Sequence, residues 1–199
     1  MSPKTKSKQE TKEALLEAGT ELMFEKGYTN TGIAEILKKV NVPKGSFYYY
    51  FDSKEDFAVE IINHFDCFYR TEVLSVLRDK SQTPLKRLKA YCKRGKETFM
   101  DADCKKGCII GNLSQEMASQ SECLRKKLFE VISDWSNEFA LCIKEGQEMG
   151  EIKEDFQPEE LAEMFLSGWQ GAVMRGKTTR DTKPLDIFIE LTFDGLLKK

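Results

Sequence analysis

The chain has 199 residues, of which 40% are hydrophobic and 32% are charged, and its formal net charge is −2. This composition is typical of a globular protein with one large domain, or with a small domain and a larger one. No stretch is long and apolar enough to cross a bilayer, and the polar, lysine-rich beginning does not resemble a secretory signal, so we expect a cytoplasmic protein without a membrane partner.

The first third of the sequence predicts three short helices. Helical periodicity covers about residues 9–26 and 32–39, and a third helix of about two turns begins near Pro43. A proline suits the first turn of a helix because its missing N–H needs no partner there. We expect Gly27 to end the first helix and Thr31 to cap the second.

The remainder predicts six further helices and almost no strand. Their expected ranges are about residues 54–78, 84–103, a short helix ending near 118, 122–148, 158–176, and 184 to the C-terminus. Residues 104–108 are expected to interrupt the pattern. The predicted fold class is therefore all-α, with about nine helices.

The last two predicted helices have the pattern of an interface. Residues 185–197 contain eight large apolar side chains that cover nearly the whole circumference of a helix. The preceding helix carries the small residues Gly168, Gly171 and Ala172, which allow another helix to approach closely. A helix that is apolar all round must be buried on several sides, so we predict a homodimer closed by these helices.

Cysteine and histidine content argues against a metal site. The chain has six cysteines, no Cys-x-x-Cys pair, and His64 as its one histidine, which excludes a Cys/His zinc finger. In a reducing cytoplasm most of the cysteines should be buried, reduced side chains. We expect neither a metal nor a cofactor.

Residues 27–57 carry the most informative pattern, because two short helices joined by a tight turn fit a helix-turn-helix. In its second helix, Phe47, Tyr50 and Phe51 are expected to face the core. The outward-facing side chains are expected to be Lys44, Ser46, Tyr48 and Tyr49. Hydroxyl groups and a lysine suit phosphates and base edges. Residues 1–54 also hold nine lysines against seven acidic residues, so we predict double-stranded DNA as the partner.

This stretch resembles the N-terminal domain of TetR-family transcriptional regulators, without gaps from Gly27 to Phe51. The matching positions are Gly27, Tyr28, Thr31, Ile36, Val42, Lys44, Gly45, Ser46, Tyr48, Tyr50 and Phe51, followed by Lys54 and Glu55 at the start of the fourth helix. Three positions depart from the family pattern. Val40-Asn41 replaces a small residue and a glycine in the turn, Pro43 replaces a common serine, and Tyr49 stands where histidine is frequent.

The resemblance implies a helix-turn-helix DNA-binding domain over residues 1–53 and a ligand-binding and dimerisation domain over residues 54–199. It implies a regulator, by family habit a repressor, that leaves its operator when an effector binds. The family's phosphate contacts fall on Thr31, Lys44 and Lys54, and its major-groove contacts fall on Ser46, Tyr48 and Tyr49.

In the same family the C-terminal domain encloses an effector pocket. The candidate lining residues are His64, Phe68, Tyr91, Phe99, Trp135, Phe139, Phe165 and Trp169. A largely apolar pocket with a few polar groups favours a small organic or aromatic effector. An aromatic residue on a helix also serves as ordinary core, and this alternative applies to each of them.

A second resemblance concerns residues 107–117, which are similar to a segment of the subgroup of repressors that respond to electrophiles and N-ethylmaleimide. The sensing cysteine of that subgroup corresponds to Cys108, and one of its lysines corresponds to Lys177. Lys105, Lys106 and a helix N-terminus near Cys108 would favour a thiolate. The alternative is that Cys108 is a small buried residue at a helix start.

Two other functions stay open from the residues alone. Cys104 and Cys108 are a candidate thiol redox pair, which would make the protein an enzyme. No histidine lies nearby to act as a base, and neither a glycine-rich phosphate loop nor an HExxH motif occurs, so we expect no enzyme. A helical scaffold that binds no DNA is the other alternative, but it would not require tyrosines and a lysine exposed on a short helix.

Overall fold

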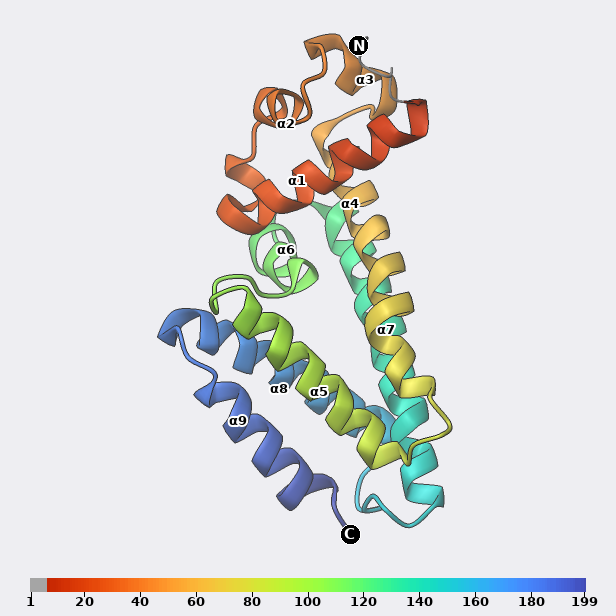
Figure 1. The fold of residues 1–199 in the computed structure, drawn as a ribbon. Coiled ribbons are helices and arrows are strands. Elements are labelled where there is room, and N and C mark those ends of the chain that lie inside the picture. The colour runs from red at the N-terminus through yellow and green to blue at the C-terminus, as the bar shows by residue number, and fades with distance from the viewer. Residues whose placement is uncertain (1–6) are drawn as a thin grey trace. The chain divides into compact units, whose positions relative to one another are not determined.

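In the computed structural model, residues 7–199 are described, and they fold into helices joined by short loops (Figure 1). The predicted all-α class is confirmed, because extended pairing within this part of the chain is limited to one isolated bridge between Ile152 and Lys198. None of its helices is long and apolar enough to span a membrane.

The chain divides into two compact units. The first unit comprises Met1–Asp66 and Ile109–Leu128, and the second comprises Cys67–Cys108 and Phe129–Lys199. The first unit therefore takes in more of the chain than the predicted DNA-binding domain of residues 1–53. Its helices, two of which extend into the second unit, are α1 (Lys8–Asn30), α2 (Ile33–Val40), η1 (Lys44–Ser46), α3 (Phe47–Tyr50), α4 (Lys54–Phe68), α6 (Ile109–Met117) and α7 (Glu122–Glu148).

The first helix is capped at its start and bent near its end. Ser7 and Glu10 form a capping box, in which each side chain accepts the backbone N–H of the other residue. Gly27 then leaves the helical conformation with a φ of 81°, a value that glycine adopts without the strain of a side chain. The predicted stop at Gly27 is thus a bend, after which α1 continues for one turn.

The turn into the second helix differs from its prediction. Thr31 does not cap α2, because the N-cap residue is Gly32 and it makes no side-chain hydrogen bond. The Thr31 side chain is fully buried, and its hydroxyl donates to the carbonyl of Gly27 at 2.7 Å. Thr31 therefore closes the end of α1. Asn41 ends α2 in the left-handed conformation, as its tolerance of positive φ predicts.

The core of the first unit forms where α1, α3 and α4 meet. Leu15, Phe47, Phe57 and Ile61 are fully buried there. Gly19 of α1 permits this contact, because a Cβ at that position would lie 2.3 Å from Cζ of Phe57. The three-helix arrangement thus depends on apolar periodicity and on one close approach.

The second unit contains the remaining helices. They are η2 (Tyr69–Val73), η3 (Leu74–Arg78), α5 (Pro84–Asp101), α8 (Pro158–Thr179), α9 (Lys183–Glu190) and η4 (Leu191–Leu197). The predicted helix over residues 54–78 is helical throughout, but it passes from α-helix through a π-helical segment (η2) to a 3₁₀-helix (η3). Phe68, the last residue of α4, was predicted to line the pocket but is 55% exposed.

Candidate nucleic-acid interface and sensing cluster

The exposed face of α3 presents two aromatic side chains. Tyr48 and Tyr49 are each 65% exposed, Lys44 is exposed and Ser46 is half-buried. Large aromatic side chains are normally buried in a folded chain, so two exposed neighbours on one short helix indicate a contact surface. All four predicted groove and phosphate residues of η1 and α3 therefore lie on or near the surface.

A four-residue helix is not stable by itself, and an aromatic cluster holds α3 in place. The rings of Phe47 and Phe57 lie 5.2 Å apart between centroids, and those of Phe51 and Phe57 lie 4.7 Å apart. Phe47 and Phe51 are buried, as predicted, while Tyr50 is half-buried. This anchoring fixes the backbone from which Tyr48 and Tyr49 project.

Two lysines from the start of α1 reach α3 and Phe51, the residue that follows it. Nζ of Lys8 lies 4.4 Å from the centroid of the Tyr49 ring, and Nζ of Lys12 lies 5.7 Å from that of Phe51. Lys12 also pairs with Glu60 at 2.7 Å. Sequence reasoning missed Lys8, because only the fold brings the start of α1 beside α3.

The side chains of the other two predicted phosphate contacts, Thr31 and Lys54, lie near the end of α1. Thr31 is buried, and its side chain has no exposed surface to offer a phosphate in this conformation. Lys54 donates to the carbonyl of Thr29 at 3.2 Å and lies 4.4 Å from the centroid of the Tyr28 ring. Partial burial lowers the pKa of Lys54, and the charge of Glu116 opposes that effect.

Glu116 of α6 joins the end of α1 within the same unit. Its two carboxylate oxygens accept the backbone N–H groups of Tyr28 and Thr29, each at 2.8 Å. Burial alone would raise the pKa of Glu116, but the hydrogen bonds from Thr29 and Tyr28 and the charge of Lys54 outweigh it and lower the pKa. Nothing in the sequence distinguishes Glu116 from any other acidic residue on a short helix.

The second unit holds an aromatic cluster that contains most of the predicted pocket residues. Tyr91, Trp135, Phe139, Phe165, Phe99 and Trp169 are all buried. The hydroxyls of Tyr69 and Tyr91 are 2.5 Å apart, and the Tyr69 ring stacks on Trp135 with centroids 4.1 Å apart. Burial raises the pKa of both tyrosines, and nearby Cys108 adds to the effect. Cys108 is therefore close enough to these phenols for its charge to act on them.

Two predicted pocket residues lie outside this cluster. Phe68 is exposed, and His64 is also exposed and belongs to the first unit. Tyr69, which sequence reasoning did not select, takes the inward position beside Tyr91. No local sequence pattern marks the start of the π-helical segment at Tyr69, so the sequence alone could not identify this residue.

All six cysteines have free thiols, and they fall into three environments. Cys92 and Cys142 are buried, which raises the pKa of both, that of Cys142 to about 11. Cys67 and Cys123 are exposed. Cys104 and Cys108 are half-buried in the loop between α5 and α6. Asp103 and Cys104 both adopt positive φ there, and Arg180 donates to the Cys104 carbonyl at 3.3 Å.

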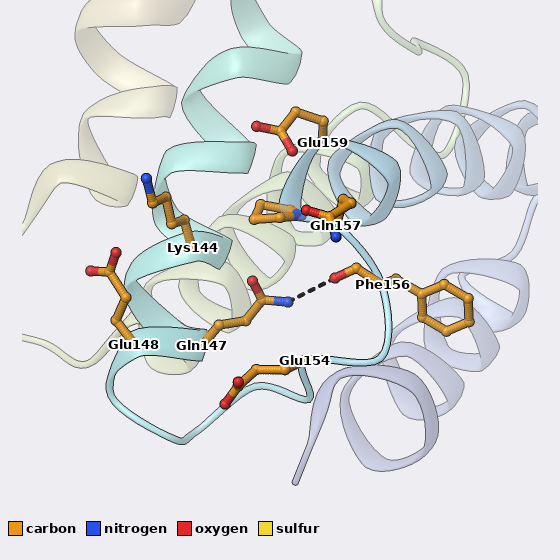
Figure 2. Close-up of a pocket in the computed structure, with 8 residues that line it drawn as sticks. Lys144, Gln147, Glu148, Glu154, Phe156, Gln157 and Glu159 are labelled. Atoms are coloured by element: carbon orange, nitrogen blue, oxygen red, sulfur yellow. Dashed lines mark hydrogen bonds between the residues drawn. The ribbon is translucent and has the colours of Figure 1, made fainter.

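Two hollows on the surface of the second unit differ in the character of their lining. One, of about 550 Å³, lies where α7 ends and α8 begins, and its lining is polar: Figure 2 shows Gln147 donating to the carbonyl of Phe156 at its edge. The other, of about 510 Å³, is a more apolar groove between α8 and α9. Gly168, Gly171, Ala172 and Ile187 are among its lining residues, so it coincides with the predicted dimer face.

Two family models match this chain, one in its N-terminal part and one in its C-terminal part. Residues 15–61 match the family model described as "Bacterial regulatory proteins, tetR family", and residues 84–192 match "Tetracyclin repressor-like, C-terminal domain". The chain is 38% identical over 183 residues to the HTH-type transcriptional repressor DhaR of Mycobacterium sp. strain GP1, which covers 92% of this chain and 90% of DhaR.

Solved structures agree. A regulatory protein TetR from Rhodobacter sphaeroides is 37% identical, with a TM-score of 0.87 over 93% of this chain and 97% of that one. The reduced form of Escherichia coli NemR is 27% identical, with a TM-score of 0.85 over 95% of this chain and 98% of that one.

Proposed function

Because this chain belongs to the tetR family of bacterial regulatory proteins, we propose that it is a repressor that binds its operator as a homodimer and leaves it when an effector acts on the second unit. Membership makes the chain a DNA-binding transcriptional regulator. Repression, the dimer and the effector class are the proposed parts. The cytoplasm, where bacterial DNA lies, is the place where such a repressor works.

The observation that carries the DNA contact is the paired exposure of Tyr48 and Tyr49 on a helix anchored by buried Phe47 and Phe51. We assign Tyr48, Tyr49 and Ser46 to the major groove. The hydroxyls of all three residues donate to or accept from base edges, and the two tyrosine rings offer apolar surface to thymine methyl groups.

Phosphate contact is assigned to Lys44 and Lys54. Lys44 is exposed at the start of the recognition segment, where a positive charge meets the DNA backbone. Lys54 uses one donor on the Thr29 carbonyl, and an ammonium group has three donors, so it can hold α1 and a phosphate together. Thr31 is left out because its hydroxyl is buried.

The dimer is assigned to α8, α9 and η4. Ile187 of α9 is 46% exposed and Leu191 of η4 is 65% exposed, although both lie in the apolar stretch of residues 185–197. The adjacent groove is lined by small residues, including Gly171, against which a Cβ would meet nothing within 4 Å. A second copy would cover these apolar surfaces and place two recognition helices in successive major grooves, about 34–36 Å apart or somewhat more.

The effector is assigned to the aromatic cluster around Tyr91 and Trp135, which suits a small organic or aromatic molecule. Cys108 beside this cluster, with Cys104 as its candidate partner and Lys177 on α8, makes a reactive electrophile the preferred form of that effector. The similar NemR structure is that of a reduced form, which supports a role for a thiol in this assignment. Cys108 immediately precedes α6, and α6 carries Glu116, so a change at the thiol would reach the end of α1.

One experiment tests the proposed function as a whole. Duplexes that bind the full-length protein are selected from a random-sequence library, and the affinity for the selected duplex is measured before and after treatment with N-ethylmaleimide. We expect a roughly palindromic duplex and its release on treatment. Failure to select any duplex would contradict DNA binding, and selected DNA that stays bound after treatment would contradict the electrophile part alone.

A further inference from the structure

Lys8 and Tyr49 make a contact that the proposed function does not use. Nζ of Lys8 lies 4.4 Å from the centroid of the Tyr49 ring, within the range of a cation–π interaction. The Tyr50 ring also packs against Tyr49 in an edge-to-face arrangement, with centroids 5.0 Å apart and the ring planes at 85°. Tyr49 thus makes contacts with Lys8 and Tyr50 although 65% of it is exposed.

The backbone at Lys8 is fixed by the start of α1. The Ser7 hydroxyl accepts the N–H of Glu10 at 3.1 Å, and the Glu10 carboxylate accepts the N–H of Ser7 at 2.7 Å. Lys8 is the first residue of the helix, so this capping box determines where its side chain begins. The ammonium group therefore approaches Tyr49 from an ordered position.

We infer that Lys8 is a positioning residue for DNA recognition, holding the Tyr49 ring in the orientation in which its phenol meets a base edge. The inference rests on the proposed function, because it assumes that Tyr49 enters the major groove. An exposed tyrosine that is already ordered loses less conformational freedom when it binds. Lys8 would thus act on sequence discrimination through Tyr49.

A simple phosphate contact is the competing role for Lys8, and the two roles differ in what they change. A lost phosphate contact weakens binding to every duplex alike and reduces the salt dependence by about one unit of slope. Loss of positioning weakens the specific complex more than the non-specific one, and it has no effect once the Tyr49 ring is absent.

The test is a double-mutant cycle with Lys8→Met and Tyr49→Leu in the full-length protein. The probes are a duplex selected from a random library and a scrambled duplex of equal length. Lys8→Met should reduce the ratio of specific to non-specific affinity about two- to fivefold, as expected for an exposed cation–π pair. In the Tyr49→Leu background the same change should leave that ratio unaltered, and Lys8→Arg should keep it near the parent value.

Two controls separate the inference from other causes. Lys38→Met removes an exposed lysine of α2 in the same unit. It should change neither the ratio of specific to non-specific affinity nor the effect of Tyr49→Leu on that ratio. In the free protein, the ring resonances of Tyr49 in an NMR spectrum should shift on Lys8→Met and not on Lys38→Met. Equal loss for both duplexes, persistence of the effect in Tyr49→Leu, or unmoved Tyr49 resonances would overturn the inference while DNA binding stands. A parent protein that binds no selected duplex would overturn both.

Discussion

The carboxylate of Glu116 accepts the backbone N–H of Tyr28 at 2.8 Å, and this bond joins α6 to the end of α1. The second carboxylate oxygen accepts the N–H of Thr29 at the same distance. Both N–H groups follow the bend at Gly27, where the helix no longer supplies partners in the regular way. One side chain of α6 therefore stabilises the turn that leads into the helix-turn-helix.

Glu116→Gln should lower the free energy of unfolding by about 1–2 kcal/mol at pH 7, because an amide has one oxygen for two N–H donors. The pKa of Glu116 lies below the ordinary value of 4.5, so its ionised form contributes stability above that pH. This contribution is lost as the pH falls through the lowered pKa of the folded state. The difference between the parent and Glu116→Gln should therefore shrink below pH 4.5.

Denaturant titrations between pH 3 and pH 7 measure this difference, and Gln115→Ala, at an exposed neighbour on α6, is the control. A difference that stays constant over this range would show that ionisation of Glu116 does not stabilise the fold.

Gly27→Ala should destabilise the protein by about 1–2 kcal/mol, because residues with a side chain are strained at positive φ. A Cβ at Gly27 would also lie 2.7 Å from a carboxylate oxygen of Glu116, which would have to move. Gly32→Ala is the matched control, since a Cβ there meets nothing within 4 Å. Thermal unfolding should show a lower Tm for Gly27→Ala and an unchanged Tm for Gly32→Ala. Equal changes in both variants would contradict the assigned role of the bend.

Sequence patterns predicted the helices well because most of them are long and amphipathic. The range predicted for α7, residues 122–148, agrees with the structure, since its apolar side chains repeat with helical spacing over seven turns. Phe47 and Phe51 were likewise assigned to the core correctly. Helical periodicity indicates which side chains are buried, so the burial of such residues can be predicted without knowing the tertiary structure.

Contacts between distant segments could not be predicted in this way. Thr31 is a residue type that often serves as an N-cap. In the fold it is buried, and its hydroxyl donates to the carbonyl of Gly27 instead. The inward position falls on Tyr69, the first residue of the π-helical segment, and not on the exposed Phe68. Glu116 and Lys8 act on residues more than 40 positions away, and no local pattern marks either of them.

Leu191→Glu should convert the proposed dimer to a monomer, because it places a charge on the apolar face that a second copy would cover. Leu141→Glu is the matched control, as Leu141 is similarly exposed but lies on α7, outside the α8–α9 groove. Light scattering at micromolar concentration should give twice 22.9 kDa for the parent and for Leu141→Glu, and 22.9 kDa for Leu191→Glu. A parent protein that scatters as a monomer would contradict the dimer.

Cys108 should react with limiting maleimide before the other five cysteines, even though Cys67 and Cys123 are more exposed. Lys105, Lys106 and the start of α6 are the groups expected to favour its thiolate. Mass spectrometry of the labelled peptides measures the order of reaction. Operator release by N-ethylmaleimide should be lost in Cys108→Ser and kept in Cys123→Ser, and release that persists in Cys108→Ser would leave a non-covalent ligand as the effector.

The central claim, that the exposed face of η1 and α3 reads DNA, is tested most directly by a salt-titrated binding measurement on a selected duplex. Lys44→Ala should weaken binding to all duplexes and reduce the salt dependence by about one unit of slope. Tyr48→Ala should weaken binding to the selected duplex more than to a scrambled one, because its side chain is 65% exposed and faces away from the core. If both variants bind the selected duplex as the parent does, α3 is not the recognition helix.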